Sequence, residues 1–263
     1  MRQEAPEAHE MIPAERRARI VEVLRERRAV RVSSLSEDLG VSEMTIRRDF
    51  ERLEAEGVLT RTHGGAVLKR RIVEESLYFD RVATHVAEKR RIAQNAAAMI
   101  EPGETVFLSS GTTAAQVLRH VDPDLEARIV THSVGALAEA QDLRLDLVLV
   151  GGLYRPLSNA VSGPMAVEHV SRFRATRMLL GVDGFDLEEG LTTPSMGMAA
   201  VERAMIDQTR GEVVVLADRS KIGVVADVVI CGFDKVDAVM VDDGVDEAVR
   251  DEITRLGLRC IVV

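Results

Sequence analysis

The sequence is poor in aromatic residues and in cysteine: it has no tryptophan, and only 3% of its 263 residues are aromatic. Proteins that hold single-stranded nucleic acid stack the bases on aromatic side chains, so this class is disfavoured. Cys231 and Cys260 stand far apart, which fits neither a disulfide framework nor a zinc site. No apolar run reaches the roughly twenty residues of a membrane helix, and the first thirteen residues lack the apolar core of a signal peptide. We therefore expect a cytoplasmic protein without a metal or other cofactor.

Charge is present but unevenly distributed. The whole chain carries −9 at pH 7. Residues 12–72 hold 14 Lys and Arg against 10 Asp and Glu, a net charge of +4, so the remainder carries −13. A basic segment on an acidic protein is the pattern that attraction to DNA phosphates produces. The length is enough for one small and one medium domain.

The segment from Val41 to Ala66 predicts a helix that lies in a DNA groove, followed by a hairpin. Ser42 can cap the start of the helix, and Ile46, Phe50 and Leu53 recur at the spacing of one buried face. A recognition helix meets base edges with side chains near its N-terminus that lie off the buried face. The candidate DNA-binding residues on the helix and the hairpin are Ser42, Thr45, Arg47, Arg48, Arg61 and His63.

The preceding residues complete a helix-turn-helix. A helical face runs through residues 16–28, and residues 30–32 alternate as a short strand. Ser34 and Glu37 have the spacing of a capping box, which predicts a short helix that begins there, and Gly40 supplies the sharp turn.

After the recognition helix, a Gly64-Gly65 pair between two alternating segments predicts a β-hairpin. We therefore expect a winged helix-turn-helix domain over residues 12–70. Taken alone, Arg47 and Arg48 fit a solvated helix face equally well, and it is the capped helix pair and the wing that favour DNA binding.

The run VSEMTIRRDFERLEAEGVLTRTHGGA is similar, nearly position for position, to the DNA-binding signature of the DeoR family of transcriptional regulators. The similarity extends over residues 14–68. It implies that Arg47 and Arg48 face the DNA and that residues 62–66 form the wing.

The second half of the chain predicts a different architecture. Residues 71–88 are expected to be a linker and residues 89–263 a single effector domain. Continuous apolar strands separated by helices are typical of a parallel sheet covered on both faces, so the fold class is α/β. The expected strands are residues 105–108, 129–131, 145–150, 177–182, 213–216, 238–241 and 258–263.

Polar segments follow five of these strands, at the end of the sheet where ligands gather. Glycine allows close approach of the backbone, hydroxyls and free N–H groups can hold an anion, and a lysine adds a point charge. A Ser-Gly-Thr-Thr loop by itself fits a helix cap equally well. The five segments together predict a site for a phosphorylated sugar or polyol, formed by Ser110, Gly111, Thr112, Thr113, Thr131, Ser133, Gly151, Gly152, Asp183, Gly184 and Lys221.

Residues 76–260 also resemble the DeoR sensor domain and, through it, the ribose-phosphate isomerases. The resemblance implies the same effector contacts, with His132 where many family members have Asn. Glu202 occupies the position of the isomerases' catalytic Glu, but Thr193 stands where they carry a catalytic Lys. The site therefore lacks one of the two side chains that the isomerases use for proton transfer, which favours binding without turnover.

The resulting prediction is a transcriptional repressor of sugar or polyol genes that binds double-stranded operator DNA and is controlled by a phosphorylated sugar. We expect a homo-oligomer, because one winged helix contacts too few bases. The alternative is a sugar-phosphate isomerase-like enzyme fused to a DNA-binding head. A nucleoid protein that binds DNA without sequence preference conflicts with the net acidic charge.

Overall fold

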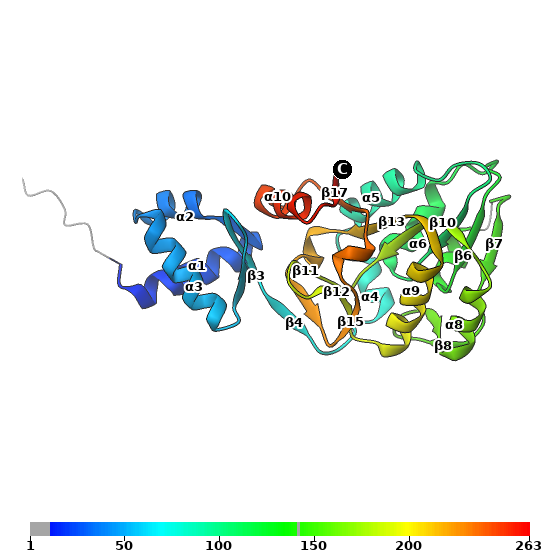
Figure 1. The fold of residues 1–263 in the computed structure, drawn as a ribbon, viewed down its shortest axis with the longest axis horizontal. Helices are drawn as coiled ribbons and strands as arrows, with labels where there is room; N and C mark the ends of the chain where they lie inside the picture. The colour runs from blue at the N-terminus through cyan, green and yellow to red at the C-terminus, as the bar shows by residue number, and fades with distance from the viewer. Residues whose placement is uncertain (1–10, 141–142) are drawn as a thin grey trace, which may run out of the picture.

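The chain folds into two domains, which the computed structural model describes over residues 11–140 and 143–263 (Figure 1). Three helices and a three-stranded sheet form the N-terminal domain at one end of the molecule. Its elements are α1 (Pro13–Arg27), β1 (Ala29–Arg31), α2 (Val32–Leu39), α3 (Glu43–Ala55), β2 (Leu59–Arg61) and β3 (Gly65–Leu68). The predicted winged helix-turn-helix is confirmed.

Helix α3 packs its predicted face against the other two helices. Ile46, Phe50 and Leu53 are buried in one cluster with apolar residues of α1 and α2. Asp49 on the same helix is also buried, and its carboxylate accepts a hydrogen bond from Arg16 Nε at 2.5 Å. This ion pair joins α3 to α1 inside the small core, where removal of either partner would leave a buried charge uncompensated.

The start of α2 differs from the prediction. No capping box forms between Ser34 and Glu37, because the helix begins two residues earlier, at Val32, and its N-terminus has no side-chain cap. Instead, Val32 N donates to the carbonyl oxygen of Gly64 at 2.9 Å. A backbone group of the wing thus binds the first N–H group of α2, and Ser34 lies inside the helix rather than at its cap.

The wing is the hairpin of β2 and β3, with β1 paired on the other side of β3. All these pairs are antiparallel. A Cβ atom on Gly65 would lie 2.0 Å from the carbonyl oxygen of Val30, so glycine is needed where β3 approaches β1. The predicted hairpin around Gly64 and Gly65 is confirmed.

A seven-stranded parallel sheet forms the centre of the larger domain, in the order β17-β16-β13-β10-β5-β6-β7. This confirms the predicted parallel α/β fold. The strands are β5 (Thr105–Leu108), β6 (Arg128–Thr131), β7 (Asp146–Leu149), β10 (Ala175–Gly181), β13 (Thr209–Ala217), β16 (Ala238–Val241) and β17 (Arg259–Val262).

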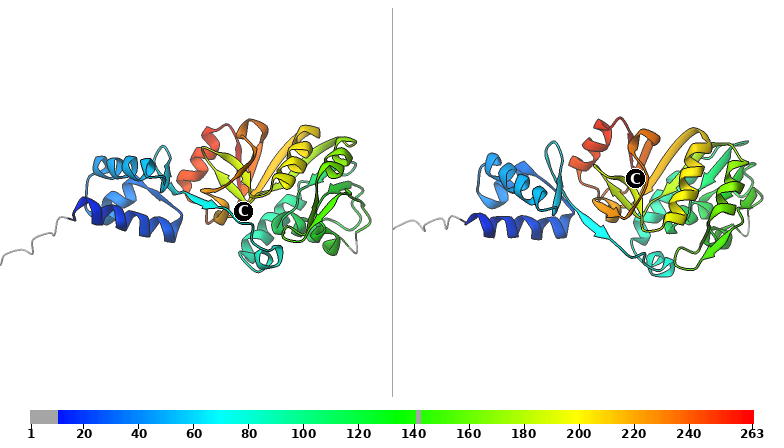
Figure 2. Two further views of the ribbon diagram at one scale, coloured as in Figure 1. Left: turned by 90° about the horizontal axis from the view of Figure 1, so that it is seen from below. Right: turned by 60° about the horizontal axis from the view of Figure 1, so that its bottom comes forward.

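Helices cover both faces of this sheet (Figure 2). In β10, Met178 and Leu180 face one core, whereas Leu179 between them faces the other, as the alternation of side chains along a strand requires. One face carries α5 (Val86–Ala97), α6 (Thr112–Val117) and α7 (Gly135–Glu139); the other carries α8 (Pro164–Ser171), α9 (Met196–Gln208) and α10 (Glu247–Arg255).

Shorter elements surround the sheet, and none of the described helices combines the length and hydropathy needed to span a membrane. The segment expected to be a linker, residues 71–88, contains α4 and enters α5. The shorter elements are β4 (Arg70–Ile72), which pairs with β14 (Val224–Ala226); α4 (Tyr78–Val82); the hairpin β8 (Leu153–Arg155) and β9 (Ala160–Ser162); the sheet of β11 (Gly184–Asp186), β12 (Gly190–Thr193) and β15 (Val228–Cys231); and the 3-10 turns η1 (Leu118–His120), η2 (Arg219–Lys221) and η3 (Phe233–Lys235).

The strand order contains a switch point between β5 and β10. From β5 the chain adds β6 and β7 on one side, and from β10 it adds β13, β16 and β17 on the other. Loops that leave the carboxyl ends of two such central strands run in opposite directions, and the crevice between them is the usual ligand site of open α/β sheets.

Candidate functional site

The first candidate site is the exposed surface of α3. Ser42 caps this helix: its hydroxyl oxygen accepts from Thr45 N at 3.2 Å and lies 2.9 Å from the hydroxyl of Thr45. Arg47 is exposed and donates to Glu43 at 3.2 Å. Arg48 is also exposed, and its side chain makes no hydrogen bond or ion pair with any residue that the structure describes. The start of α3 therefore presents two arginines to solvent.

The wing presents the other two predicted residues. Arg61 does not extend freely, since its Nε donates to Glu54 Oε2 at 2.7 Å and its Nη1 lies 3.4 Å from Glu51 Oε1. His63 is exposed at the tip, and its backbone N donates to Glu252 of α10 at 3.4 Å. The structure thus brings the helix start and the wing together on one domain, while two acidic side chains of α3 neutralise Arg61.

The second candidate site is a small cavity at the switch point of the sheet. It encloses about 30 Å³ among the loops that follow β5, β10 and β13. Six of the predicted effector-binding residues line it: Ser110, Gly111, Thr112, Thr113, Asp183 and Lys221.

A buried histidine holds the loop that follows β5. His132 Nε2 accepts a hydrogen bond from Ser110 N at 3.0 Å, and its Nδ1 lies 3.1 Å from the carbonyl oxygen of Val161. The ring therefore carries its proton on Nδ1 and donates it to Val161. Burial lowers the pKa of His132 to about 4, so the ring stays neutral and keeps its acceptor nitrogen for Ser110.

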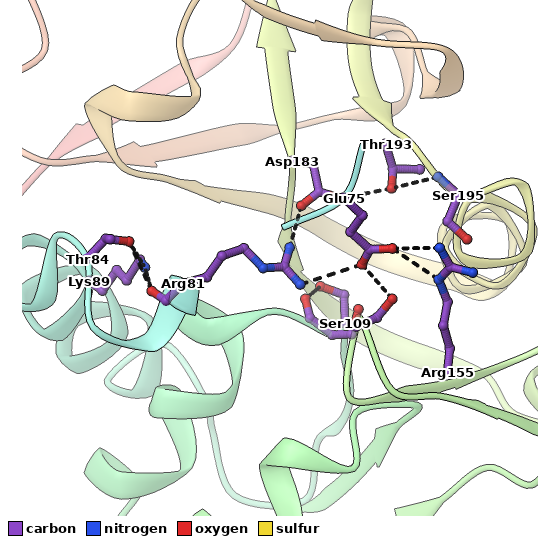
Figure 3. A network of polar contacts seen from close by, with 11 residues as sticks. Glu75, Arg81, Thr84, Lys89, Ser109, Arg155, Asp183, Thr193 and Ser195 are labelled. Carbon is purple, nitrogen blue, oxygen red and sulfur yellow. Dashed lines mark hydrogen bonds and ion pairs between the residues drawn. The ribbon is translucent and has the colours of Figure 1, made fainter. Parts of the chain in front are cut away.

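Three carboxyl groups line the cavity, those of Glu75, Asp183 and Glu202. Asp183 accepts hydrogen bonds from the Thr193 hydroxyl at 2.8 Å and from Arg81 Nη1 at 2.6 Å (Figure 3). Glu202 is buried, and its Oε2 atom has no hydrogen-bond partner among the described residues. Burial, together with the nearby Asp183 and Glu75 carboxylates, raises the pKa of Glu202 well above its usual range, which favours the uncharged acid.

Five predicted residues do not line this cavity: Thr131, Ser133, Gly151, Gly152 and Gly184. The strand order accounts for four of them, because β6 and β7 stand one and two strands away from β5, on the side opposite β10. Without the order of the strands, every polar loop at the carboxyl edge looked equally close to the site. Their contact with an effector stays a prediction.

Several of these residues have local structural roles instead. Thr131 Oγ1 accepts from Ser133 N at 3.0 Å, and Ser133 Oγ in turn accepts from Ala136 N at 3.2 Å, at the start of α7. Gly151 N donates to His169 Nδ1 at 3.0 Å. These contacts hold the turns that follow β6 and β7.

Sequence reasoning missed two charged residues that lie in the cavity wall, Glu75 and Arg81. Both belong to the segment interpreted as a linker, whose composition gives no periodicity that would place them beside Asp183. Lys89, at the start of α5, was missed as well: its Nζ donates to the carbonyl oxygen of Arg81 at 2.5 Å, and burial lowers its pKa to about 8.

No three His, Cys, Asp or Glu side chains within residues 11–140 and 143–263 gather closely enough to hold a metal ion. The cavity chemistry is instead that of hydroxyls, carboxyl groups and a lysine. Such groups can bind a polyhydroxylated anion.

Comparisons with known proteins match both domains to one family. The model of the DeoR-like helix-turn-helix domain matches residues 16–71, and that of the DeoR C terminal sensor domain matches residues 84–243. This chain belongs to the DeoR family. Its members include the HTH-type transcriptional regulator GlpR of Haloferax volcanii, which is 34% identical over 251 residues, 95% of this chain and 98% of that protein.

Other DeoR-family relatives carry names of the same kind. A lactose phosphotransferase system repressor of Staphylococcus epidermidis is 32% identical over 229 residues, 85% of this chain and 90% of the relative. Among solved structures, ribose 5-phosphate isomerase A of Methanocaldococcus jannaschii matches with a TM-score of 0.38 and 20% identity, over 51% of this chain and 53% of that one.

Membership in the DeoR family confirms the predicted class of protein. The chain is a DNA-binding transcriptional regulator rather than an enzyme. The isomerase-like alternative is not favoured: the family models and the curated relatives describe regulators, and Thr193, which stands at the position expected for a catalytic lysine, donates its hydroxyl proton to Asp183.

Proposed function

We propose that this protein represses genes of sugar or polyol metabolism and that a phosphorylated sugar or polyol controls its affinity for operator DNA by binding in the switch-point cavity. The observation that carries the proposal is the buried Glu202 carboxyl, whose Oε2 has no hydrogen-bond partner among the described residues and which shares one cavity with the Ser110–Thr113 loop and Lys221. A regulator of this kind works on chromosomal DNA, so the proposed location is the cytoplasm.

The cavity chemistry suits a ligand with one anionic end and several hydroxyls. A buried polar group without a partner costs about 1–3 kcal/mol, which a ligand hydroxyl bonded to Glu202 would recover. Asp183 supplies a second acceptor for hydroxyls. Lys221 and the hydroxyls of the loop after β5 supply the positive charge and the donors that a phosphate needs.

DNA binding is assigned to the exposed start of α3 and to the wing. Arg47 and Arg48 reach base edges or phosphates, and an arginine can read guanine with two hydrogen bonds. The proposed surface also includes Ser42, Thr45, Arg61 and His63. Arg61 must give up its hydrogen bond to Glu54 in order to contact the DNA backbone. Because one head contacts few bases, we propose that the protein acts as a homo-oligomer on repeated half-sites.

The DNA surface is tested by Arg48→Ala. Duplexes selected by the wild-type protein from a random-sequence library serve as the probe in fluorescence anisotropy. We expect a 5- to 150-fold loss of affinity, which corresponds to about 1–3 kcal/mol for one two-pronged contact. Arg128→Ala, which removes an exposed arginine of β6 in the other domain, is the control and leaves the affinity unchanged. Equal affinity of Arg48→Ala and wild type would contradict this assignment.

The effector site is tested by thermal unfolding with D-ribose 5-phosphate, fructose 1-phosphate, glucose 6-phosphate and glycerol 3-phosphate, each beside its unphosphorylated form and inorganic phosphate. At a hundredfold excess over Kd, binding stabilises by about 2.7 kcal/mol, or about 5–10 °C for a domain of this size. Thr112→Ala should reduce the shift, and Thr105→Ala, at the opposite end of β5, should not. No shift with any phosphorylated compound would remove the support for this site.

A further inference from the structure

The switch-point cavity is too small for the ligand that its chemistry fits. It encloses about 30 Å³, whereas small-molecule sites usually span about 300–1,000 Å³. A larger cavity of about 360 Å³ lies directly outside it, and both are lined by Glu75, Arg81, Asp183 and Lys221. These shared residues separate the two spaces.

Two of these shared residues, Glu75 and Arg81, belong to residues 74–84, here called the strap. Glu75 anchors it: this carboxylate is 4% exposed, accepts from Ser158 Oγ at 2.6 Å and lies 2.9 Å from Arg155 Nη2. Arg81 closes it, with Nη1 donating to Asp183 at 2.6 Å and Nη2 lying 3.6 Å from Glu75 (Figure 3). A hydrogen bond from Tyr78 N to Leu157 O, at 2.9 Å, adds a backbone contact.

We propose that the strap is a latch over the effector site. A phosphorylated sugar or polyol enters by replacing Arg81 as the hydrogen-bond partner of Asp183, and the released strap transmits this change to the DNA-binding domain. This inference rests on the proposed function of the cavity. Arg81 and Glu75 thereby become residues that set effector affinity and its effect on DNA binding.

Competition for Asp183 follows from the contacts. Arg81 donates to one carboxylate oxygen and Thr193 to the other, and Arg81 also borders both cavities, so in the proposed latch the hydroxyls of a ligand replace Arg81 at Asp183. Arg81 is the donor that can leave, because its side chain is 15% exposed and borders the outer cavity, whereas Thr193 lies in β12 and is buried. A latch that is closed most of the time lowers the apparent affinity by the fraction of open molecules.

The strap has a short covalent path to the DNA-binding domain. Strand β3 ends at Leu68, and six residues later the strap begins, a span of at most about 20 Å when extended. The intervening β4 pairs with β14, and Arg70 N donates to Gly223 O at 2.7 Å, two residues beyond Lys221. A ligand that contacts Lys221 and displaces Arg81 therefore acts close along the chain to both strands of the β4–β14 pair, of which β4 follows the DNA-binding domain.

The test uses the full-length protein, the sugar phosphate that gives the largest thermal shift, and Arg81→Gln. Opening the latch should tighten that compound's Kd, measured by calorimetry, by about fivefold or more, because a partly buried ion pair that holds the strap closed is lost. The ratio of DNA affinities with and without the compound should fall toward one. Arg128→Gln, which removes the exposed Arg128–Asp146 pair at the other end of the sheet, should change neither value.

A second measurement needs no variant. Hydrogen exchange of the wild-type strap amides, including Tyr78 N, should become faster when the sugar phosphate is bound, although bound ligands ordinarily slow exchange. Weaker or unchanged binding by Arg81→Gln, or slower exchange in the strap, would overturn the latch while leaving the effector site intact. Absence of binding by wild type to every sugar phosphate would overturn both.

Discussion

The two candidate functional regions of this protein differ in the exposure and pairing of their charged side chains. On α3 and the wing, charged side chains are exposed and meet only acidic neighbours of their own domain, as Arg61 meets Glu54. In the switch-point cavity, charged groups are buried and held in specific pairs, as Arg81 is held by Asp183. In the proposed function, the first surface attracts the DNA polyanion from a distance, and the second binds a small molecule that replaces Arg81 at Asp183.

This difference determines what a mutation does in each region. Exposed ion pairs contribute about 0–1 kcal/mol and are screened by salt, so changes on the DNA surface alter binding more than folding. Glu202 in the cavity and His132 beside the Ser110 loop have shifted pKa values because they are desolvated, so changes at these residues alter the response to pH. The buried Arg16–Asp49 pair is an exception inside the DNA-binding domain, and it offers the strongest test.

Asp49→Ala should have the largest effect on stability. It leaves Arg16 buried without a counter-ion, a change that costs about 3–5 kcal/mol in comparable pairs. The small domain should therefore unfold and lose DNA binding, while the sensor domain keeps its thermal shift with sugar phosphates. Hydrogen exchange resolved by domain measures this separation, since the local free energy of opening is read from each segment.

The matched control is Asp146→Ala, which removes the partner of Arg128 in an exposed pair at 2.9 Å. It should change stability by less than about 1 kcal/mol. If Asp49→Ala unfolds no more than this control, the buried pair does not hold α3 to α1. If both domains unfold together, the two regions are not independent.

The winged helix-turn-helix, which carries the proposed DNA surface, was predictable from the sequence because its parts are close along the chain. Ser42, Ile46 and Arg48 occupy one helix, so a period of 3.6 residues separates the cap, the buried face and the exposed face. The hairpin follows within a few residues and carries its own glycine signal. The predicted capping box at Ser34 is wrong because α2 begins at Val32, whose amide donates to Gly64 of the wing, so Ser34 lies inside the helix.

The lining of the candidate effector cavity was predictable only in part. Reading the strand ends identified Ser110, Asp183 and Lys221, since ligands gather at the carboxyl edge of a parallel sheet. Local periodicity does not predict the order of the strands, so the loops after β6 and β7 were predicted to lie as close to the ligand as those after β5, β10 and β13. Glu75 and Arg81 reach the cavity through tertiary contacts of a segment without a repeating pattern.

The pH dependence of the sensor domain sharpens the comparison. His132 is neutral in the fold, with a pKa lowered to about 4 by burial, whereas an unfolded histidine titrates near 6.5. Between these values the unfolded state binds the extra proton, so stability falls as pH falls below about 6.5 and rises as pH rises. At pH 5 the contribution of His132 should be about 2 kcal/mol less favourable than at pH 8.

Urea unfolding of the sensor domain at pH 8 and pH 5 measures this loss against His132→Gln, whose side-chain oxygen can accept from Ser110 N but does not titrate. Glu202 contributes with the opposite sign, because its raised pKa gives stability at low pH that is lost as pH rises. The difference between the two proteins isolates His132. Equal pH slopes in wild type and His132→Gln would show that this ring does not titrate between the two states.

The smallest expected effect lies at the start of the recognition helix. Ser42→Ala removes the acceptor of the Thr45 amide, a cap whose loss costs about 1 kcal/mol. Ser42→Asn, which supplies a side-chain oxygen at the same position without a charge, should restore most of that stability. Denaturant unfolding and hydrogen exchange in α3 measure the stability of both variants. If Ser42→Ala is as stable as wild type, the cap contributes nothing, and α3 is held by the Arg16–Asp49 pair and the apolar core. The difference between the two regions would then be smaller, because the proposed DNA surface would depend on buried contacts as fully as the cavity does.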